Sequence, residues 1–233
     1  MTKISILAAF FLNGFAFFCL FALLGLNACN NSVRQPNAGP LRLAALPDSA
    51  ALRTYRITLA RLAAADQADR QTIFRVFRQH GFRSAQADTA NRWLMRQDSL
   101  RLATFQALER RYGWPRAKSV GAASVQQAYL LVQHAPDRVQ ASYQDSLRAA
   151  HARGELGSQD YATYLDRVLV NEGQPQRYGT QSGRRVLASG QEENYLLPVE
   201  DVTHLDQRRA TMQLEPLLPQ LRPGTTILKP TTD

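Results

Sequence analysis

Residues 161–181 read YATYLDRVLVNEGQPQRYGTQ, and this stretch decides how the chain folds. Its first part predicts an amphipathic helix that begins at Ser158 and ends at Gly173. The apolar face of that helix consists of Tyr161, Tyr164, Leu165 and Val168. The second part has almost no aliphatic residues, and the spacing after Gln174 changes to that of short strands and turns. The stretch therefore separates a helical part from a small β segment at about residues 174–200.

Helical spacing of apolar residues also predicts four earlier helices. Their expected ranges are 49–81, 88–112, 121–133 and 137–153. The third is apolar on nearly every side, so we expect it to be the buried central helix. The predicted fold is mainly α, a compact bundle of about five helices with a small C-terminal β hairpin or flap. The expected strands are 178–181, 185–188 and 195–199, and one more short helix is expected at 206–212.

Polar residues interrupt the apolar surfaces of two predicted helices. Asp66 falls in the middle of the apolar stripe of the first helix, with Arg70 on the same face one turn later. A carboxylate that faces the core needs a partner. An internal Asp66–Arg70 ion pair, a helix break that exposes Asp66, and a functional site all fit this pattern. His134 ends the buried central helix, where the helix dipole favours its charged form and packing disfavours it; a histidine hydrogen-bonded within the core is the ordinary interpretation.

The segment Gln176–Gln181 is dense in hydrogen-bond donors and acceptors. Asp166 and Arg167 precede it, and periodicity points them away from the apolar face, which predicts that they are exposed. We expect one ligand pocket between the bundle and the β segment, lined by Asp66, Arg70, His134, Asp166, Arg167, Gln176, Tyr178 and Gln181. The alternative is that these groups pair with one another as a rigid polar brace that fixes the β segment onto the helices.

The N-terminus indicates export. Lys3 precedes an apolar run from Ile4 to Leu26, which is typical of a signal sequence. The run ends in Leu26-Asn27-Ala28-Cys29, which resembles a bacterial lipobox and predicts cleavage before Cys29 and its lipidation. An uncleaved transmembrane anchor is the alternative, because about 20 apolar residues span a bilayer. The expected organisation is a signal peptide (1–28), a flexible tether (29–46), one helical domain (47–221) and a loose tail (222–233).

Composition and missing motifs limit the function classes. The net charge of +9 comes from arginines dispersed along the chain rather than from a clustered stripe, so no nucleic-acid partner is expected. The histidines show no metal-ligand spacing, and cleavage would leave no free thiol, so we expect no metal site and no cofactor. Nucleophile-elbow, Walker, dinucleotide and zinc-helix motifs do not occur.

Several short motifs, in order, resemble a bacterial family of uncharacterised domains, known as a domain of unknown function. The matching pieces are Asp66-Gln67 with Arg70, Gly113-Trp114-Pro115, Val120-Gly121, Gln133-His134-Ala135, Tyr164 to Arg167, Gln176 to Gln181, Pro198 to Asp201 and Arg208-Arg209. The resemblance spans about residues 65–217 and implies a fold without a known reaction. It also implies asparagine at the place of Arg101, so this member would differ if that position touches a ligand.

The sequence thus favours a lipid-anchored protein of the bacterial envelope whose helical domain binds a polar ligand or an envelope component. Its membrane partner would be reached through the lipid, and its oligomeric state is open. An envelope enzyme, most plausibly a hydrolase, is the alternative, since Asp66, His134 and Asp166 could supply acid and base groups. A scaffold for another envelope protein is the third hypothesis, and it predicts an exposed apolar patch.

Overall fold

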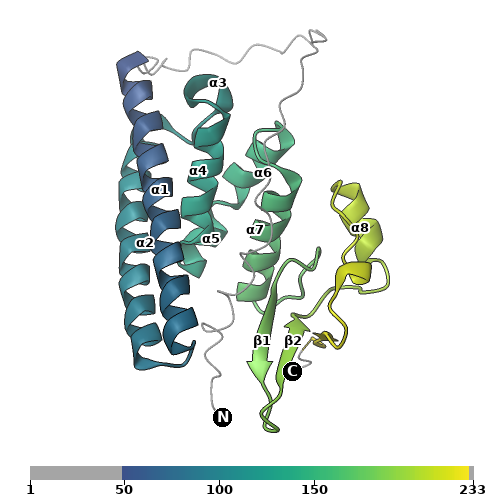
Figure 1. Cartoon of the computed structure of the whole chain (residues 1–233). Helices are drawn as coiled ribbons and strands as arrows, with labels where there is room; N and C mark the ends of the chain where they lie inside the picture. The colour runs from purple at the N-terminus through teal and green to yellow at the C-terminus, as the bar shows by residue number, and fades with distance from the viewer. Residues whose placement is uncertain (1–48, 231–233) are drawn as a thin grey trace.

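A computed structural model describes residues 49–230 and shows two long helices beside a cluster of shorter ones. Helices α1 (Ser49–His80) and α2 (Ala85–Tyr112) form an antiparallel pair. The short α3 (Ala117–Val120) leads into α4 (Ala122–Gln133), which packs against both α1 and α2. On the far side of α4 lie α5 (Asp137–Ser142), α6 (Gln144–Ala152) and α7 (Ser158–Asn171) (Figure 1).

Helix α4 is the central element of the core, as its uniform hydrophobicity predicted. Seven of its 12 residues are buried, because α1, α2 and the α5–α7 group surround it. The main hydrophobic cluster joins Leu59 of α1, Phe105 of α2, Val125 and Val132 of α4, and Tyr164 of α7. The mainly helical fold class is therefore confirmed.

The predicted fourth helix is interrupted at Tyr143, which separates α5 from α6. The Tyr143 ring packs against Phe105 and Trp114, and its hydroxyl donates to Glu109 Oε2 of α2 at 2.5 Å. Periodicity predicted that Tyr143 faces inward, but it could not predict the helix break. The break occurs where Tyr143 contacts residues of α2, which are distant from it in the sequence.

The β segment is a three-stranded sheet in the order β1-β2-β3. β1 (Ser182–Val186) pairs antiparallel with β2 (Glu192–Leu196), with Gly183 opposite Tyr195. β3 (Thr226–Ile227) pairs parallel with β2 and comes from the segment that was predicted to be a loose tail. Both hairpin strands begin about three residues before their predicted positions. The predicted strand at 178–181 is wrong, since that segment turns around the side chain of Asp166.

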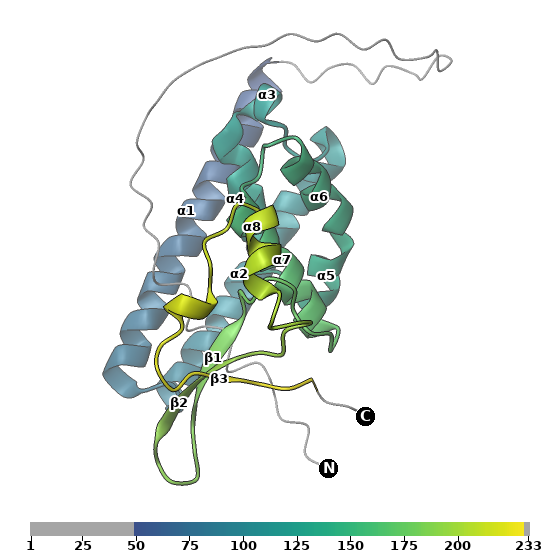
Figure 2. The same cartoon turned by 90° about the vertical axis from the view of Figure 1, so that its right-hand side faces the viewer.

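The C-terminal part lies over the α7 side of the bundle. It contains α8 (Leu205–Thr211) and a 3-10 turn (Leu218–Gln220) before β3. Figure 2 shows α8 and the chain leading to β3 covering this side. The hexapeptide at 176–181 is consequently enclosed between α7 and α8 rather than placed on a free hairpin.

The predicted signal sequence, Cys29 and the predicted tether lie outside residues 49–230. Within the described part of the chain, no helix is both long and apolar enough to cross a bilayer.

Candidate functional site

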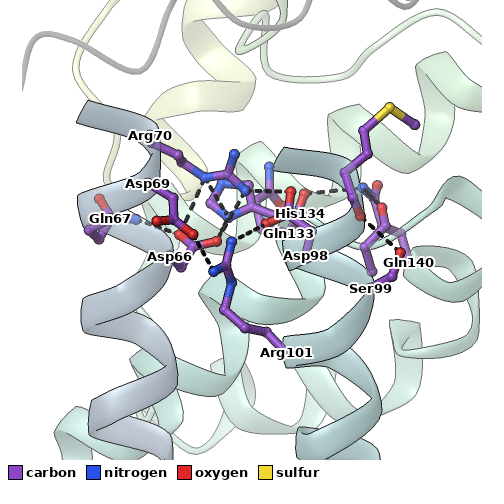
Figure 3. Close-up of polar contacts among 12 residues, drawn as sticks. Asp66, Gln67, Asp69, Arg70, Asp98, Ser99, Arg101, Gln133, His134 and Gln140 are labelled. Carbon is purple, nitrogen blue, oxygen red and sulfur yellow. Dashed lines mark hydrogen bonds and ion pairs between the residues drawn. The ribbon is translucent and has the colours of Figure 1, made fainter. Parts of the chain in front are cut away.

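Charged side chains from three helices meet at one edge of the core, and we call this set the charged cluster (Figure 3). It contains Asp66, Asp69 and Arg70 of α1, Asp98 and Arg101 of α2, and His134 at the end of α4. Arg70 is its centre, and its guanidinium nitrogens lie within hydrogen-bonding distance of groups on all three helices. The cluster combines three carboxylates, two guanidinium groups and one imidazole.

Asp66 and Arg70 form the ion pair that their spacing predicted. Asp66 is 1% exposed, and its oxygens Oδ1 and Oδ2 accept from Arg70 Nη2 at 3.1 Å and Nε at 3.3 Å. Helix α1 continues through Asp66, so the alternative of a helix break before it is wrong. The pair is nevertheless more than a helix-surface contact, because both residues also bond to groups on other helices.

Two residues of α2 extend the cluster in a line of alternating charge. Asp98 Oδ2 accepts from Arg70 Nη2 at 3.0 Å, and its other oxygen accepts from Arg101 Nη2 at 2.9 Å. Arg101 Nη1 reaches back to Asp69 Oδ2 on α1 at 2.5 Å. Asp98 therefore bridges two arginines, and the line ties α1 to α2.

His134 closes the cluster from α4. Its Nδ1 lies 3.0 Å from Asp66 Oδ1 and 3.1 Å from Arg70 Nε. A single ring nitrogen cannot donate to the carboxylate and accept from the guanidinium at once. The negative charge of Asp66 favours the tautomer with the proton on Nδ1, which leaves Nε2 with a free electron pair. Among residues 49–230, Nε2 has no hydrogen-bond partner, and the side chain is 20% exposed.

Burial and charge set the protonation of this pair. Burial, reinforced by the charge of Arg70 and opposed by the hydrogen bond to Asp66, holds the pKa of His134 below its ordinary value. Burial alone would raise the pKa of Asp66, but hydrogen bonds from His134 and Gln67 and the charge of Arg70 lower it. The stable state near neutral pH is therefore an ionised carboxylate beside a neutral imidazole.

Asp166 anchors a second set of polar groups, which we call the polar brace: Asp166, Gln176, Thr180 and Gln181. Asp166 is fully buried and accepts from the backbone N–H groups of Arg177 (2.8 Å), Tyr178 (3.0 Å) and Thr180 (2.9 Å). It also accepts from the Thr180 hydroxyl at 2.9 Å. Burial raises the pKa of Asp166, and these hydrogen bonds oppose that shift. The predicted exposure of Asp166 is wrong, because the 176–181 segment covers this side of α7.

Both glutamines of the polar brace bond to backbone groups inside the segment and beyond it. Gln176 Nε2 donates to the carbonyls of Gln181 and Leu197, and its Oε1 accepts from Gln181 N at 2.7 Å. Gln181 Nε2 donates to Thr163 O of α7 at 3.2 Å. Arg209 of α8 donates to Tyr178 O at 2.6 Å, so the turn is held from a second helix.

The eight residues of the predicted pocket thus divide between two sets. Asp66, Arg70 and His134 belong to the charged cluster, whereas Asp166, Gln176, Tyr178 and Gln181 belong to or contact the polar brace. Arg167 is half-buried rather than exposed as periodicity predicted. With the Gln133 amide turned so that its oxygen faces Arg167, the Nε of Arg167 donates to that oxygen at 2.8 Å; Gln133 is the neighbour of His134. The positive charge of Arg70 contributes to lowering the pKa of Arg167 after burial, so Arg167 lies on the charged-cluster side.

Asp69, Asp98, Arg101 and Gln133 were not among the predicted site residues. Asp98 and Arg101 fall at helical spacing between the buried Leu94 and Phe105 of α2, which is the same signal that identified Asp66 in α1. Applying that criterion to α2 would have found them. Within the described chain, no three histidine, cysteine or acidic side chains are placed to hold a metal ion; the expectation of no metal and no cofactor stays a prediction.

Comparison with known proteins gives a family match. The model of a family described as a family of unknown function (DUF6624) matches residues 55–224, which include the charged cluster and the polar brace. No protein with a curated description matches the chain, and neither does any solved structure.

Proposed function

Because the chain belongs to the DUF6624 family of unknown function, we propose its function from the chemistry of its own residues. The helical domain binds a small polar ligand at the charged cluster. A lipid on Cys29 holds the domain at the membrane of the bacterial envelope.

The observation that carries the binding proposal is the convergence of ionisable groups from α1, α2 and α4 at the edge of an apolar core. Burying ion pairs is costly, and well-packed hydrophobic residues of similar size are often at least as stabilising. Stability alone therefore gives little reason to place three carboxylates and two arginines here. Selection for a ligand explains the arrangement directly.

Two groups of the cluster support a ligand position beside Arg70 and His134. Arg70 uses Nε and Nη2 for its protein contacts, and no residue in 49–230 accepts a hydrogen bond from its Nη1. His134 Nε2 is similarly without a partner in that part of the chain. A donor and an acceptor held in place by bonds to Asp66 would recognise a ligand with adjacent acceptor and donor groups, such as an amide, a sugar hydroxyl or a protonated acid.

The binding proposal is tested by thermal-shift screening of the mature chain carrying Cys29→Ser against amino acids, sugars, sugar phosphates and peptidoglycan fragments. A ligand should raise the Tm of the wild type but not of Asp66→Asn. We expect the Tm of Asp66→Asn without ligand to fall less than that of Asp166→Asn, because the partners of Asp66 are side chains that can rearrange and Arg70 keeps its pair with Asp98. Asp145→Asn is the matched control, since Asp145 is an exposed carboxylate paired with Arg148 on α6. Equal ligand shifts in the wild type and Asp66→Asn would rule out this site.

A hydrolase is the second candidate, and the Asp66–His134 pair favours it. With Nδ1–H held by Asp66, Nε2 could take a proton from water as the water attacks an ester or amide carbonyl. His134→Asn keeps a donor toward Asp66 but has no group at the position of Nε2. It should lower hydrolysis of a panel of ester, amide and glycoside substrates by about 100-fold or more. Undiminished turnover in His134→Asn would exclude this mechanism.

A further inference from the structure

The end of the α1–α2 pair carries a second surface, distinct from the charged cluster. A shallow hollow of about 730 Å³ lies between the two helices near their turn. Its lining is mostly apolar and includes Ile73, Val76, Ala90 and Trp93. Trp93 is 43% exposed, and Phe82 in the turn is 47% exposed. Large aromatic side chains are therefore presented to the outside at this end of the pair.

The same end is strongly cationic. Residues 75–96 contain five arginines (Arg75, Arg78, Arg83, Arg92 and Arg96) and one acidic residue, Asp88. All five arginines are exposed. Among residues 49–230 none of them has an ion-pair partner, although Arg75 and Arg92 each donate to a threonine one turn earlier. By contrast, the arginines of the β hairpin, Arg184 and Arg185, are paired with glutamates on the neighbouring strand.

We propose that this face of the α1–α2 end docks on the surface of a bilayer that contains anionic phospholipids. An exposed tryptophan on an apolar hollow matches the interfacial region of a bilayer, where the amphipathic indole ring is favoured. The arginines that lack an ion-pair partner can bind the lipid phosphate groups of the interfacial region, and their aliphatic stems add to the apolar contact with the bilayer. The exposed tryptophan, the apolar hollow and the arginines together favour binding to an anionic bilayer surface over a neutral one.

Chain length is consistent with docking on the same membrane that would hold the lipid anchor, a point that rests on the proposed function. Nineteen residues lie between Cys29 and Ser49, where α1 begins, and such a segment spans at most about 70 Å. Helix α1 has 32 residues, which corresponds to a length of about 48 Å. The α1–α2 turn can therefore reach the membrane although the tether joins the opposite end of α1.

The test uses the fluorescence of Trp93 in the full chain reconstituted into vesicles whose lipids carry bromine on their acyl chains. The chain has two tryptophans, and Trp114 lies in the aromatic cluster with Phe105 and Tyr143, so Trp93→Phe supplies the background signal. Trp93 should be quenched in phosphatidylcholine mixed with phosphatidylglycerol but not in phosphatidylcholine alone. Reconstitution does not require acylation of Cys29, so the outcome is separable from the anchor proposal.

Charge variants make the test specific. Replacing Arg75, Arg92 and Arg96 together with glutamine should reduce the docked-to-undocked ratio on the order of 100-fold, since each basic residue at an anionic surface contributes roughly a factor of five. The quenching would then fall to the level in phosphatidylcholine. The matched control replaces Arg53, Arg56 and Arg61, which are exposed on the other half of α1, and should leave quenching unchanged.

Three results would overturn the proposal. The first is absence of Trp93 quenching in both vesicle types, and the second is equal quenching in both. The third is lipid-independent shielding of Trp93 together with a dimer mass in sedimentation, which would assign the hollow to a second copy of the chain.

Discussion

Asp66 and Asp166 are both buried carboxylates of helices, but their partners differ in kind. Asp66 is bonded to side chains of other ionisable residues, which can change protonation or rearrange when a ligand arrives. Asp166 is bonded to backbone N–H groups and one hydroxyl of a single turn. The first arrangement suits binding or proton transfer, and the second suits holding the backbone in one conformation.

Asp166→Asn should therefore destabilise the protein strongly. In the variant an amide NH₂ would replace Asp166 Oδ2, which accepts hydrogen bonds from the backbone N–H groups of Tyr178 and Thr180. These buried N–H groups would then face another donor and lose their acceptor. We expect a loss of about 3 kcal/mol in the free energy of unfolding, measured by urea denaturation. Asp145→Asn, at an exposed carboxylate, should change the free energy of unfolding by less than about 0.5 kcal/mol. A small effect of Asp166→Asn would contradict the brace interpretation.

His134 makes stability depend on pH. Its folded-state pKa lies below the ordinary value of 6.5, chiefly because of burial. Between the folded and unfolded pKa values the unfolded chain binds more protons, so the free energy of unfolding should fall as pH drops below about 6.5. Urea denaturation at about pH 7.5 and about pH 5.5 would measure this loss.

His134→Asn is the comparison for that pH series, because it removes the titrating group while keeping a donor toward Asp66. Asp66, Arg70 and Asp98 are the charged groups that act on His134, and all remain in the variant. The slope between the two pH values should become shallower in His134→Asn. An unchanged slope would show that other groups cause the pH dependence.

At the scale of elements, α7 has two covered sides instead of one. Tyr164 and Val168 face the main core, and the 176–181 turn covers Asp166. The turn is held to Leu197, the residue after β2, by the Gln176 side chain and to α8 by the hydrogen bond from Arg209 to Tyr178 O. The polar brace thus joins the helical bundle to the sheet and to α8.

Gly179 lies at the tightest point of this turn. Its φ of +70° is unfavourable for a side chain, and an added Cβ would lie 2.6 Å from Leu217 Cδ2 and 3.3 Å from Leu205 Cδ2. Gly190 has a φ of +82° with no atom within 4 Å of such a Cβ. Gly190→Ala should therefore show the conformational cost alone. Gly179→Ala should lower the free energy of unfolding by about 1 kcal/mol more, as judged from thermal or urea unfolding. Equal losses in the free energy of unfolding for Gly179→Ala and Gly190→Ala would mean that the side chains of Leu217 and Leu205 move aside without an energetic cost.

At the scale of the whole molecule, the two proposed surfaces place the domain relative to a membrane. The lipid on Cys29 would attach the chain, and the arginine-rich end of α1–α2 would lie on the lipid surface. The charged cluster would lie farther along the same helix pair. Asp66 and Arg70 lie in the middle part of α1 and precede Thr72–His80, the part of α1 that lines the hollow. Ligand binding would therefore occur close to the bilayer.

The anchor itself predicts acylation at Cys29. A metabolically supplied alkyne fatty acid should label the wild-type chain, and Cys29→Ser should abolish the label and release the mature domain from membranes if cleavage still occurs. Cys19→Ser is the internal control, because Cys19 lies inside the segment that cleavage removes. Label retained in Cys29→Ser would refute lipidation at this residue.

The sequence by itself was sufficient for the longer helices and for Asp66 and Arg70, where polar residues interrupt an apolar stripe. Periodicity identified α1, α2, α4 and α7 because each buries one face or, for α4, nearly its whole surface, and Asp66 with Arg70 was visible as an exception within a stripe. These are local properties that spacing along one helix encodes.

Tertiary structure alone decided which polar residues belong together. Asp166 and Arg167 are neighbours in sequence, yet one is enclosed by the 176–181 turn and the other faces Gln133 beside the charged cluster. Periodicity assigns one buried face per helix and could not anticipate that a distant segment covers a second face of α7. The third strand, Thr226–Ile227, was not predicted for the same reason. These two residues form a strand only because they pair with β2, which lies about 30 residues earlier in the chain. Contacts between segments far apart in the chain set these features, and no local pattern records them.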